Sequence, residues 1–482
     1  MMLEEGDGVV MDGFGIKWLR DLVWGPWMLC FLIGTGIYLN VLLRGLPIRK
    51  MFRSVRMATC RGGTAFENKA QGQNGISSFA CLATELAATI GTGNITGVVL
   101  AMTMGGPGAL VWMMLSALVG LATKLTESTL SVKYRAKDIS GLPIGGPMIT
   151  LSRAFPLPRI GKFLAGCYAF FAILTSFGMG NAIQANSIAS SVRVVFGRDV
   201  KTTAGILLIL TLFSVFGGMK RISKISTCLV PAMGAVYIAS CLGMVLLWPQ
   251  NLLPGLCSIL ISAFSPRAAS GGLFGLVTAS WIKSLNCGIS CGVFSNEAGL
   301  GAGGISAAAT NASDPVEQGW ISMSGVFFDT LVICFLTGIA YACSGVGSMA
   351  CSGSLQLKSG VIVDPLNGTD LMIAAFEKAY GRYGGALLCF CMCLFAFATI
   401  LGWAVQGETA FRYLFGDNGR LAYRLLYAVV TWFGACLGAS VIWNVSDLAN
   451  GLLAIPNLIS LWVLGPEACK DILEWERKPH LF

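Results

Sequence analysis

The sequence contains almost no histidine and few charged residues. Its one histidine is His480, and charged residues make up only 12% of the 482 positions. Soluble domains carry about twice that share of charge. Without histidine in its apolar part, the chain cannot hold a Ser-His-Asp triad, a His-ligated catalytic zinc or a histidine proton relay there.

Apolar residues dominate instead, since 55% of the residues are hydrophobic and the mean hydropathy is +0.72. An apolar segment needs about 20 residues to cross a bilayer as a helix, and we count about eleven such segments. We therefore predict an all-α polytopic membrane protein with about 11 transmembrane helices. The predicted spans are residues 18–43, 78–104, 107–132, 162–190, 202–217, 226–248, 271–304, 318–343, 384–406, 421–440 and 445–464, with a short helix over 370–380 before the ninth.

Glycine and polar residues interrupt two of the predicted spans. In the first, Gly91, Thr92, Gly93 and Asn94 follow one another within apolar sequence, and in the second we expect an interruption over Gly288–Gly292. Glycine weakens a helix, and Thr and Asn side chains can bond the freed backbone groups. Close helix packing also explains such glycines, but paired interrupted spans are typical of a transporter's central site.

Basic residues in the loops predict the orientation in the membrane. Most basic loops fall on one side if the N-terminus lies outside and the C-terminus lies in the cytoplasm, as the positive-inside rule requires. The loop with Arg193, Arg198 and Lys201 disagrees. The supporting residues are Arg44, Arg49, Lys50, Arg53, Arg56, Arg61, Lys133, Arg135, Lys137, Arg153, Arg159, Lys220, Arg221, Lys224, Arg412, Arg420, Lys470, Arg477 and Lys478.

These charges also bear on location and partners. We expect a multi-pass protein of the cell (inner) membrane of a prokaryote, surrounded by the lipid bilayer and without an obligate protein partner. The net charge of +9 is spread over short loops, so nucleic acid is not an expected partner.

The order of the interrupted spans predicts an inverted repeat. Spans two to six and seven to eleven form two sets of five, each opening with a discontinuous helix, and the odd number of spans reverses the second set. The predicted divisions are 1–62 with an extra N-terminal helix and a basic cytoplasmic loop, 63–248 as the first repeat, 249–270 as an extracellular connector, 271–465 as the second repeat, and 466–482 as a cytoplasmic tail.

Ionisable residues inside predicted spans are candidates for function. Lys124 and Glu127 lie three positions apart on one span, and we interpret them as a structural pair with a snorkelling lysine. Asp329 and Glu297 either help to bind a cation or tie helices together.

Further polar residues lie close to the first interruption or in the fourth span. Glu85 either adds charge to the site or pairs with Lys283 of the other interrupted span. Asn181, Gln184 and Ser187 recur at every third position, near one helical face. Their polar groups can bond the amine or carboxylate of an amino acid, or simply join helices.

The ninth span contains Thr399 and Trp403. The hydroxyl can coordinate sodium or bond the carbonyl four residues before it, and the indole can cover a small substrate or lie at the membrane interface. A helix break exposes N–H groups, which suit a carboxylate, and carbonyls, which suit a cation. One site can therefore hold a zwitterionic amino acid and Na⁺ through oxygen ligands.

A series of motifs runs in order over nearly the whole chain. They are Ala87–Ile95, Gly105–Ala109, Gly145–Met148, Gln184–Ala189, Phe294–Gly301, Pro315–Gly319 and Asp447–Leu452. In these motifs, of which Phe294–Gly301 is highly specific, the chain resembles the alanine or glycine:cation symporter family, the sodium:alanine symporters.

This resemblance implies the five-plus-five fold of leucine-type transporters and sodium-coupled uptake of small neutral amino acids, chiefly alanine and glycine. It implies no cofactor beyond Na⁺ as the coupling ion. If Asn181 of the fourth span is added to the residues that the resemblance implies, the expected substrate-binding residues are Gly91, Thr92, Gly93, Asn94, Asn181, Gln184, Gly292, Val293 and Trp403. The implied sodium ligands are the carbonyls of Ala87, Ile90 and Ala396 and the hydroxyl of Thr399.

The chain also departs from the pattern of the family. Cys291 stands where relatives commonly have a basic residue, and Glu85 stands where a small or apolar residue is expected. Ala302–Ala307 replaces a Ser-Ala-Pro-Ile-Ala-His-like run, and Ile149 and Thr150 replace aromatic residues. These departures bear on the exact substrate and cation more than on the fold.

Our prediction is a secondary active transporter, not an enzyme, that works by alternating access. The alternatives are a proton-coupled amino-acid symporter, an uncoupled amino-acid-binding sensor, and an intramembrane enzyme. The enzyme would need a Ser-Lys or paired-carboxylate site, because the histidine-based sites are absent.

Overall fold

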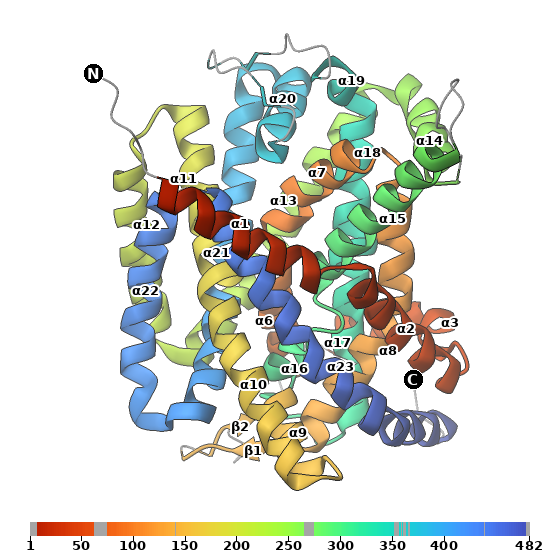
Figure 1. Ribbon diagram of the computed structural model, residues 1–482, viewed down its shortest axis with the longest axis vertical. Coiled ribbons are helices and arrows are strands. Elements are labelled where there is room, and N and C mark those ends of the chain that lie inside the picture. Colours follow the sequence, from red (N-terminus) through yellow and green to blue (C-terminus); the bar gives the residue numbers. More distant parts are fainter. Residues whose placement is uncertain are drawn as a thin grey trace.

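The protein is a bundle of helices in a computed structural model, with one short hairpin of strands (Figure 1). The structure describes residues 7–61, 75–139, 141–264, 274–350, 356–357, 359, 363–364, 367–437 and 439–478, so His480 lies outside them. The strands β1 (Ala136–Lys137) and β2 (Pro143–Ile144) pair antiparallel, with Ala136 opposite Ile144.

The helical elements follow one another along the chain. They are α1 (Asp7–Val23), α2 (Pro26–Leu42), α3 (Leu46–Arg49), α4 (Met51–Arg56), η1 (Met57–Arg61), α6 (Ser78–Thr89), η2 (Thr92–Asn94), α7 (Thr96–Met104), α8 (Ala109–Lys133), α9 (Pro147–Ala154), α10 (Pro158–Phe177), η3 (Gly178–Ala182), α11 (Ile183–Phe196), α12 (Val200–Val215), α13 (Gly218–Leu247), α14 (Pro249–Phe264), α15 (Phe274–Asn296), α16 (Ala302–Ala307), α17 (Pro315–Val326), η4 (Phe327–Cys334), α18 (Phe335–Ser344), α19 (Val346–Ala350), α20 (Gly368–Tyr380), η5 (Gly381–Tyr383), α21 (Gly384–Phe415), η6 (Asp417–Gly419), α22 (Arg420–Cys436) and α23 (Ala439–Arg477).

Many of these helices are long and apolar enough to cross a membrane. In the described part of the chain seven meet that standard: Gly15–Leu42, Ala109–Lys133, Pro158–Phe196, Gly218–Leu247, Pro315–Ser344, Gly368–Phe415 and Trp443–Arg477. Shorter apolar helices cover Ser78–Thr89, Thr96–Gly105 and Val200–Val215. The polytopic helical class is as predicted, whereas the count of about 11 crossings and the repeat remain predictions.

The first predicted interruption is confirmed. Helix α6 ends at Thr89, the backbone passes through extended conformations at Ile90 and Gly91, and the helix resumes as α7 only at Thr96. Between them η2 makes a single tight turn. The break therefore lies at the glycine and polar residues that weaken the helix in the sequence.

The second predicted interruption is wrong in position. Helix α15 continues through Gly288 and Gly292 to Asn296, and the chain leaves the helix over the next residues. Glu297 has a φ of +55°, and Gly299 and Gly301 have φ values of +100° and +75°. Such values favour glycine, so the later glycines form the break.

Gly288 and Gly292 serve helix packing instead. A Cβ at Gly288 would lie 2.3 Å from the carbonyl oxygen of Ala109, and a Cβ at Gly292 would lie 2.4 Å from the Ser116 hydroxyl. Both neighbours belong to α8, so these glycines let α15 and α8 approach closely.

The two broken helices lie side by side and run in opposite directions. Helix α7 contacts α15, and α6 contacts α16 (Figure 1). The hydroxyls of Ser78, at the start of α6, and Thr310, just after α16, lie 3.2 Å apart. Helices α6 and α16 therefore point toward opposite ends of the bundle. Helix α21 packs against α6, η2 and α16, whereas α8 packs against α15, α16 and α7.

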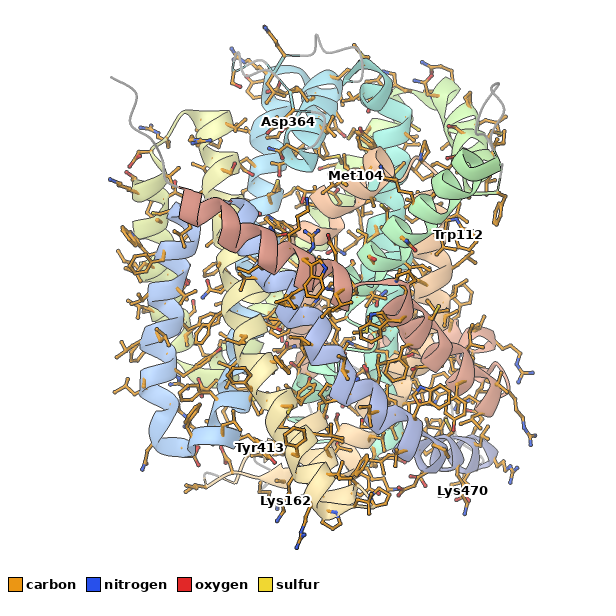
Figure 2. All side chains as sticks on the ribbon, in the orientation of Figure 1. Met104, Trp112, Lys162, Asp364, Tyr413 and Lys470 are labelled. Atoms are coloured by element: carbon orange, nitrogen blue, oxygen red, sulfur yellow. The ribbon has the colours of Figure 1, made fainter. Side chains whose placement is uncertain are left out.

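The basic loops meet at one end of the molecule, which we name the basic end. Lys133 donates to Glu467 (2.6 Å) and Asp471 (2.5 Å) of α23, and Arg412 donates to Asp138 (3.0 Å). Figure 2 places Lys162, Tyr413 and Lys470 at this end, and Asp364 and Met104 toward the opposite end. The loops after the third and ninth predicted spans and the C-terminal segment therefore lie at the same end, as predicted.

The glycine packing between α15 and α8 gives a testable prediction. Substituting Gly292→Leu forces side-chain atoms into space held by Met113 and Ser116. Overpacking of this kind costs about 1–3 kcal/mol, so the unfolding temperature of the purified protein should fall. The control is Gly205→Leu on α12, where no neighbouring atom lies within 4 Å. Equal unfolding temperatures for the two variants would contradict close packing at Gly292.

Candidate functional site

The first break is held by side chains that bond its freed backbone groups. The Asn94 Oδ1 atom accepts from the N–H of Gly91 at 2.9 Å. From η3–α11, the Gln184 Oε1 atom accepts from both the N–H (3.3 Å) and the hydroxyl (3.1 Å) of Thr92. Because no water is available inside a membrane, such bonds decide whether a broken helix is tolerated.

Asn94 also joins the first break to the second broken helix. Its amide nitrogen donates to the Ser295 hydroxyl at 2.9 Å and to the Asp329 carboxylate at 2.7 Å. The same carboxylate accepts from Ser295 and Thr330, each at 2.7 Å. All four side chains are buried. Asp329 is therefore the centre of a polar cluster that links η2, α15 and η4.

An aromatic pair covers the first break on the side of α15. A Cβ at Gly93 would lie 3.2 Å from the Phe294 ring, so only glycine fits there without displacing the ring. Phe294 in turn stacks on Trp443 of α23, with ring centroids 6.0 Å apart. Sequence reasoning recognised the Phe294–Gly301 motif but did not select Phe294 or Ser295 as site residues.

One pair of the predicted sodium ligands comes together. The Thr399 hydroxyl of α21 lies 3.2 Å from the Ile90 carbonyl oxygen, where α6 ends, and 3.1 Å from the carbonyl oxygen of Phe395. Ala87 and Ala396 are also fully buried on these two helices. Carbonyl and hydroxyl oxygens are the donors that a hard cation prefers.

The second break is held by α8, α10 and α23. Glu127 accepts from the N–H of Gly299 at 2.9 Å, and the Asn457 amide donates to the Gly299 carbonyl at 2.9 Å and to Glu127 at 2.6 Å. The Tyr168 hydroxyl donates to the carbonyl of Leu300 at 3.0 Å. Glu127 is thus a partner of the Gly299 backbone, and the prediction that it forms a structural pair with Lys124 is wrong, because Lys124 pairs with Glu85.

Trp403 lies between the second break and the fourth span. Its indole N–H donates to the Glu297 carboxylate at 3.0 Å, and a Cβ at Gly180 would lie 2.3 Å from the Trp403 side chain. Trp403 is completely buried, so it is not an interface aromatic. Glu297, with its positive φ, is directed at this indole and stays in the protein interior.

Lys124 does not snorkel to the membrane surface. It is 1% exposed, and its ammonium lies 2.9 Å from the carboxylate of Glu85, which is equally buried. Lys283, the partner considered for Glu85, is exposed. A helical pattern alone does not reveal that Lys124 points to α6, because the lysine can reach any neighbouring helix.

The fourth span does not present one polar face. Its Gly178–Ala182 turn is a π-helix, which shifts the register between Asn181 and Gln184. Asn181 donates to the Tyr427 carbonyl of α22 at 2.7 Å, and Ser187 bonds within its own helix, to the Ile183 carbonyl. Gln184 alone of the predicted set reaches the first break.

Helix α15 carries two other predicted site residues, Gly292 and Val293, and also Cys291, which departs from the family pattern. Gly292 faces Met113 and Ser116 of α8, and Val293 is buried one turn before the second break. A Cβ at Gly97 of α7 would lie 3.4 Å from the Cys291 sulfur, which is an ordinary contact. The structure thus places these residues beside the broken helices.

Charge is unevenly distributed around the breaks. Glu85, Glu127, Glu297 and Asp329 are all buried, and Lys124 is the buried basic side chain within the described ranges. Carboxylates in excess over ammonium groups favour a cation nearby.

A cavity of about 590 Å³ lies elsewhere, between the start of α6 and α13. It is lined by Ser77, Phe79, Ala80, Ser223, Lys224, Thr227 and Cys228. We assign the functional site to the breaks, because the interrupted backbone and the buried polar groups converge there.

A known family and several known proteins match nearly the whole chain. The sodium:alanine symporter family matches residues 11–480. The sodium/alanine symporter AgcS of Methanococcus maripaludis is 38% identical over 450 residues, covering 93% of this chain and 94% of that protein. The probable sodium/glutamine symporter GlnT of Bacillus subtilis is 31% identical, covering 95% of this chain and 90% of that protein.

A solved structure shares the fold. The crystal structure of MhsT in complex with L-phenylalanine superimposes with a TM-score of 0.57 at 15% identity, over 83% of this chain and 98% of that chain. This confirms the predicted fold class. The match of a transporter family over nearly the whole chain also excludes the alternative of an intramembrane enzyme. The chain belongs to the sodium:alanine symporter family, and it is a membrane transporter of the cation-coupled amino-acid symporter type.

Proposed function

We propose that the protein couples the uptake of small neutral amino acids, such as alanine or glycine, to an inward sodium gradient. The observation that carries this proposal is the convergence of the two helix breaks on one buried polar cluster. The Ile90 carbonyl and the Thr399 hydroxyl lie beside it. AgcS, the relative at 38% identity, is described as a sodium/alanine symporter, which supports the same substrate and cation.

The first break suits the charged ends of an amino acid. A substrate carboxylate would replace Asn94 and Gln184 as the acceptor of the Gly91 and Thr92 N–H groups, and Gln184 and Trp403 would supply polar atoms from two other helices. Phe294 packs against Gly93, which would restrict the substrate to a small side chain. Size selection in an apolar pocket is worth about 1–3 kcal/mol per methylene.

The coupling cation would be held where α6 meets α21. We assign it to the carbonyls of Ala87, Ile90 and Ala396 and to the hydroxyl of Thr399. The 3.2 Å approach of Thr399 to Ile90 supports the assignment. Binding of cation and amino acid would each strengthen the other, and together they would favour the step between outward-facing and inward-facing states. The basic end would face the cytoplasm of the cell.

Uptake into liposomes tests the proposal. Purified protein is reconstituted and given labelled alanine, glycine or glutamine under an inward Na⁺ gradient, with K⁺ replacing Na⁺, or under a proton gradient. We expect accumulation of alanine and glycine with Na⁺ alone. Accumulation under a proton gradient alone would show that the coupling ion is H⁺ and not Na⁺. The first variant to test as the proton carrier would then be Asp329→Asn. Binding without accumulation under any gradient would favour an uncoupled sensor.

Removal of the Thr399 hydroxyl tests the cation assignment. The variant Thr399→Ala should raise the half-saturating Na⁺ concentration for uptake about ten- to hundredfold, since losing one ligand to a charged group costs about 1.5–3 kcal/mol. The matched control is Thr409→Ala, whose hydroxyl bonds the Val405 carbonyl on the same helix, away from α6. An unchanged sodium requirement in Thr399→Ala would show that the cation lies elsewhere.

Filling the first break tests the substrate assignment. The variant Gly93→Leu should abolish alanine binding, because its side chain would occupy space beside Phe294. The control is Gly166→Leu on α10, where no neighbouring atom lies within 4 Å. Binding is measured with labelled alanine in detergent at saturating Na⁺. Retained binding with unchanged affinity would place the substrate away from Gly93.

A further inference from the structure

The Glu85–Lys124 ion pair joins three helices next to the breaks. Glu85 lies on α6, Lys124 on α8, and their charged atoms are 2.9 Å apart with each side chain 1% exposed. Gly303 of α16 covers the pair. A Cβ there would lie 2.3 Å from the Lys124 ammonium and 2.4 Å from the Glu85 carboxylate. Because Gly303 has no side chain, the Lys124 ammonium and the Glu85 carboxylate can meet beside α16.

This pair restrains the position of α6. A buried ion that loses its partner is strongly destabilising, and inside a membrane no water replaces the partner. Helix α6 therefore cannot move away from α8 unless the two charges separate or water enters. The other charges that face Lys124 come from Glu127 on α8 and Glu297 after α15, and these already bond the Gly299 N–H and Trp403.

The same short helix ends at the proposed cation site. Helix α6 spans Ser78–Thr89, and the next carbonyl, that of Ile90, accepts from Thr399 on α21. Glu85 thus attaches α6 to α8, and Ile90 attaches it to α21, within five positions of each other. A shift of α6 relative to α21 would withdraw the Ile90 carbonyl from Thr399.

We propose that Glu85 and Lys124 are positioning residues for the cation. Their ion pair holds α6 where its last carbonyls reach Thr399, so that pair formation and cation binding stabilise the same arrangement. Release of the pair accompanies the movement of α6 during transport. This inference rests on the proposed sodium site, and it assigns a role to two side chains that contact neither substrate nor cation.

The test removes both charges together. The double variant Glu85→Gln/Lys124→Gln leaves the net charge of the region unchanged, so the field felt by a cation changes little. The exchanged variant Glu85→Lys/Lys124→Glu restores an ion pair. The matched control is Glu408→Gln/Arg424→Gln, which removes a pair of 2.7 Å between α21 and α22.

Two measurements are made on each purified protein. Backbone hydrogen exchange, followed by mass spectrometry in K⁺ medium, compares α6 with α22. Binding of labelled alanine in detergent over a range of Na⁺ concentrations gives the half-saturating concentration. For the double variant we expect at least tenfold faster exchange in α6, unchanged exchange in α22, and at least a fivefold higher half-saturating Na⁺ concentration. The exchanged variant should recover most of both effects, and the control pair should show neither.

The opposite results are distinct. Unchanged exchange in α6, or faster exchange throughout α22 as well, would overturn the holding role and leave the pair as ordinary core structure. Faster exchange in α6 with an unchanged sodium requirement would overturn the link to the cation. If alanine binding to the unaltered protein does not depend on the Na⁺ concentration, the proposed function is wrong. The hydrogen-exchange measurement on α6 then still decides whether the ion pair holds the helix.

Discussion

An interrupted helix inside a membrane must find partners for its freed backbone groups within the protein. Water and lipid offer none at that depth, so every break needs polar side chains from other helices. Here the first break is bonded by Gln184 and Asn94, and the second by Glu127 and Asn457. Asn94 lies in the first break itself, whereas Gln184, Glu127 and Asn457 come from helices that are far apart in the chain. The positions of those helices are consequently fixed by the breaks.

The partners of the breaks also set the electrostatics of the centre. Asn94 and Ser295 bring the Asp329 carboxylate between the two broken helices, and Trp403 does the same for Glu297. Lys124 is the buried basic group among the described residues, and it is paired with Glu85. A centre with this excess of acidic side chains suits a positively charged ligand. The Gly91 and Thr92 N–H groups would suit a carboxylate that takes the places of the Asn94 and Gln184 oxygens. The proposed site would thereby accommodate both ends of an amino acid and a cation.

The sequence predicted the first break because glycine and hydrogen-bonding side chains coincide at Gly91–Asn94 and a second glycine-rich span recurs in the other half of the chain. It misplaced the second, because Gly288 and Gly292 look the same in sequence whether they break a helix or pack one. The actual break depends on the positive φ of Glu297 and Gly299. A positive φ is uncommon for glutamate, so the sequence does not predict one at Glu297. Tertiary contacts, such as Lys124 with Glu85, also lie beyond helical periodicity, which places a residue on a face without naming the helix opposite. The π turn before Gln184 removed Asn181 from the expected face for a similar reason.

The central claim is that one site formed by both breaks binds an amino acid and a cation together. Its most direct test is the dissociation constant for alanine, measured on the purified protein at equilibrium over a hundredfold range of Na⁺ at constant ionic strength. Reciprocal coupling predicts that alanine binds more tightly as Na⁺ rises, until the cation site saturates. A dissociation constant that is the same at every Na⁺ concentration would contradict the account.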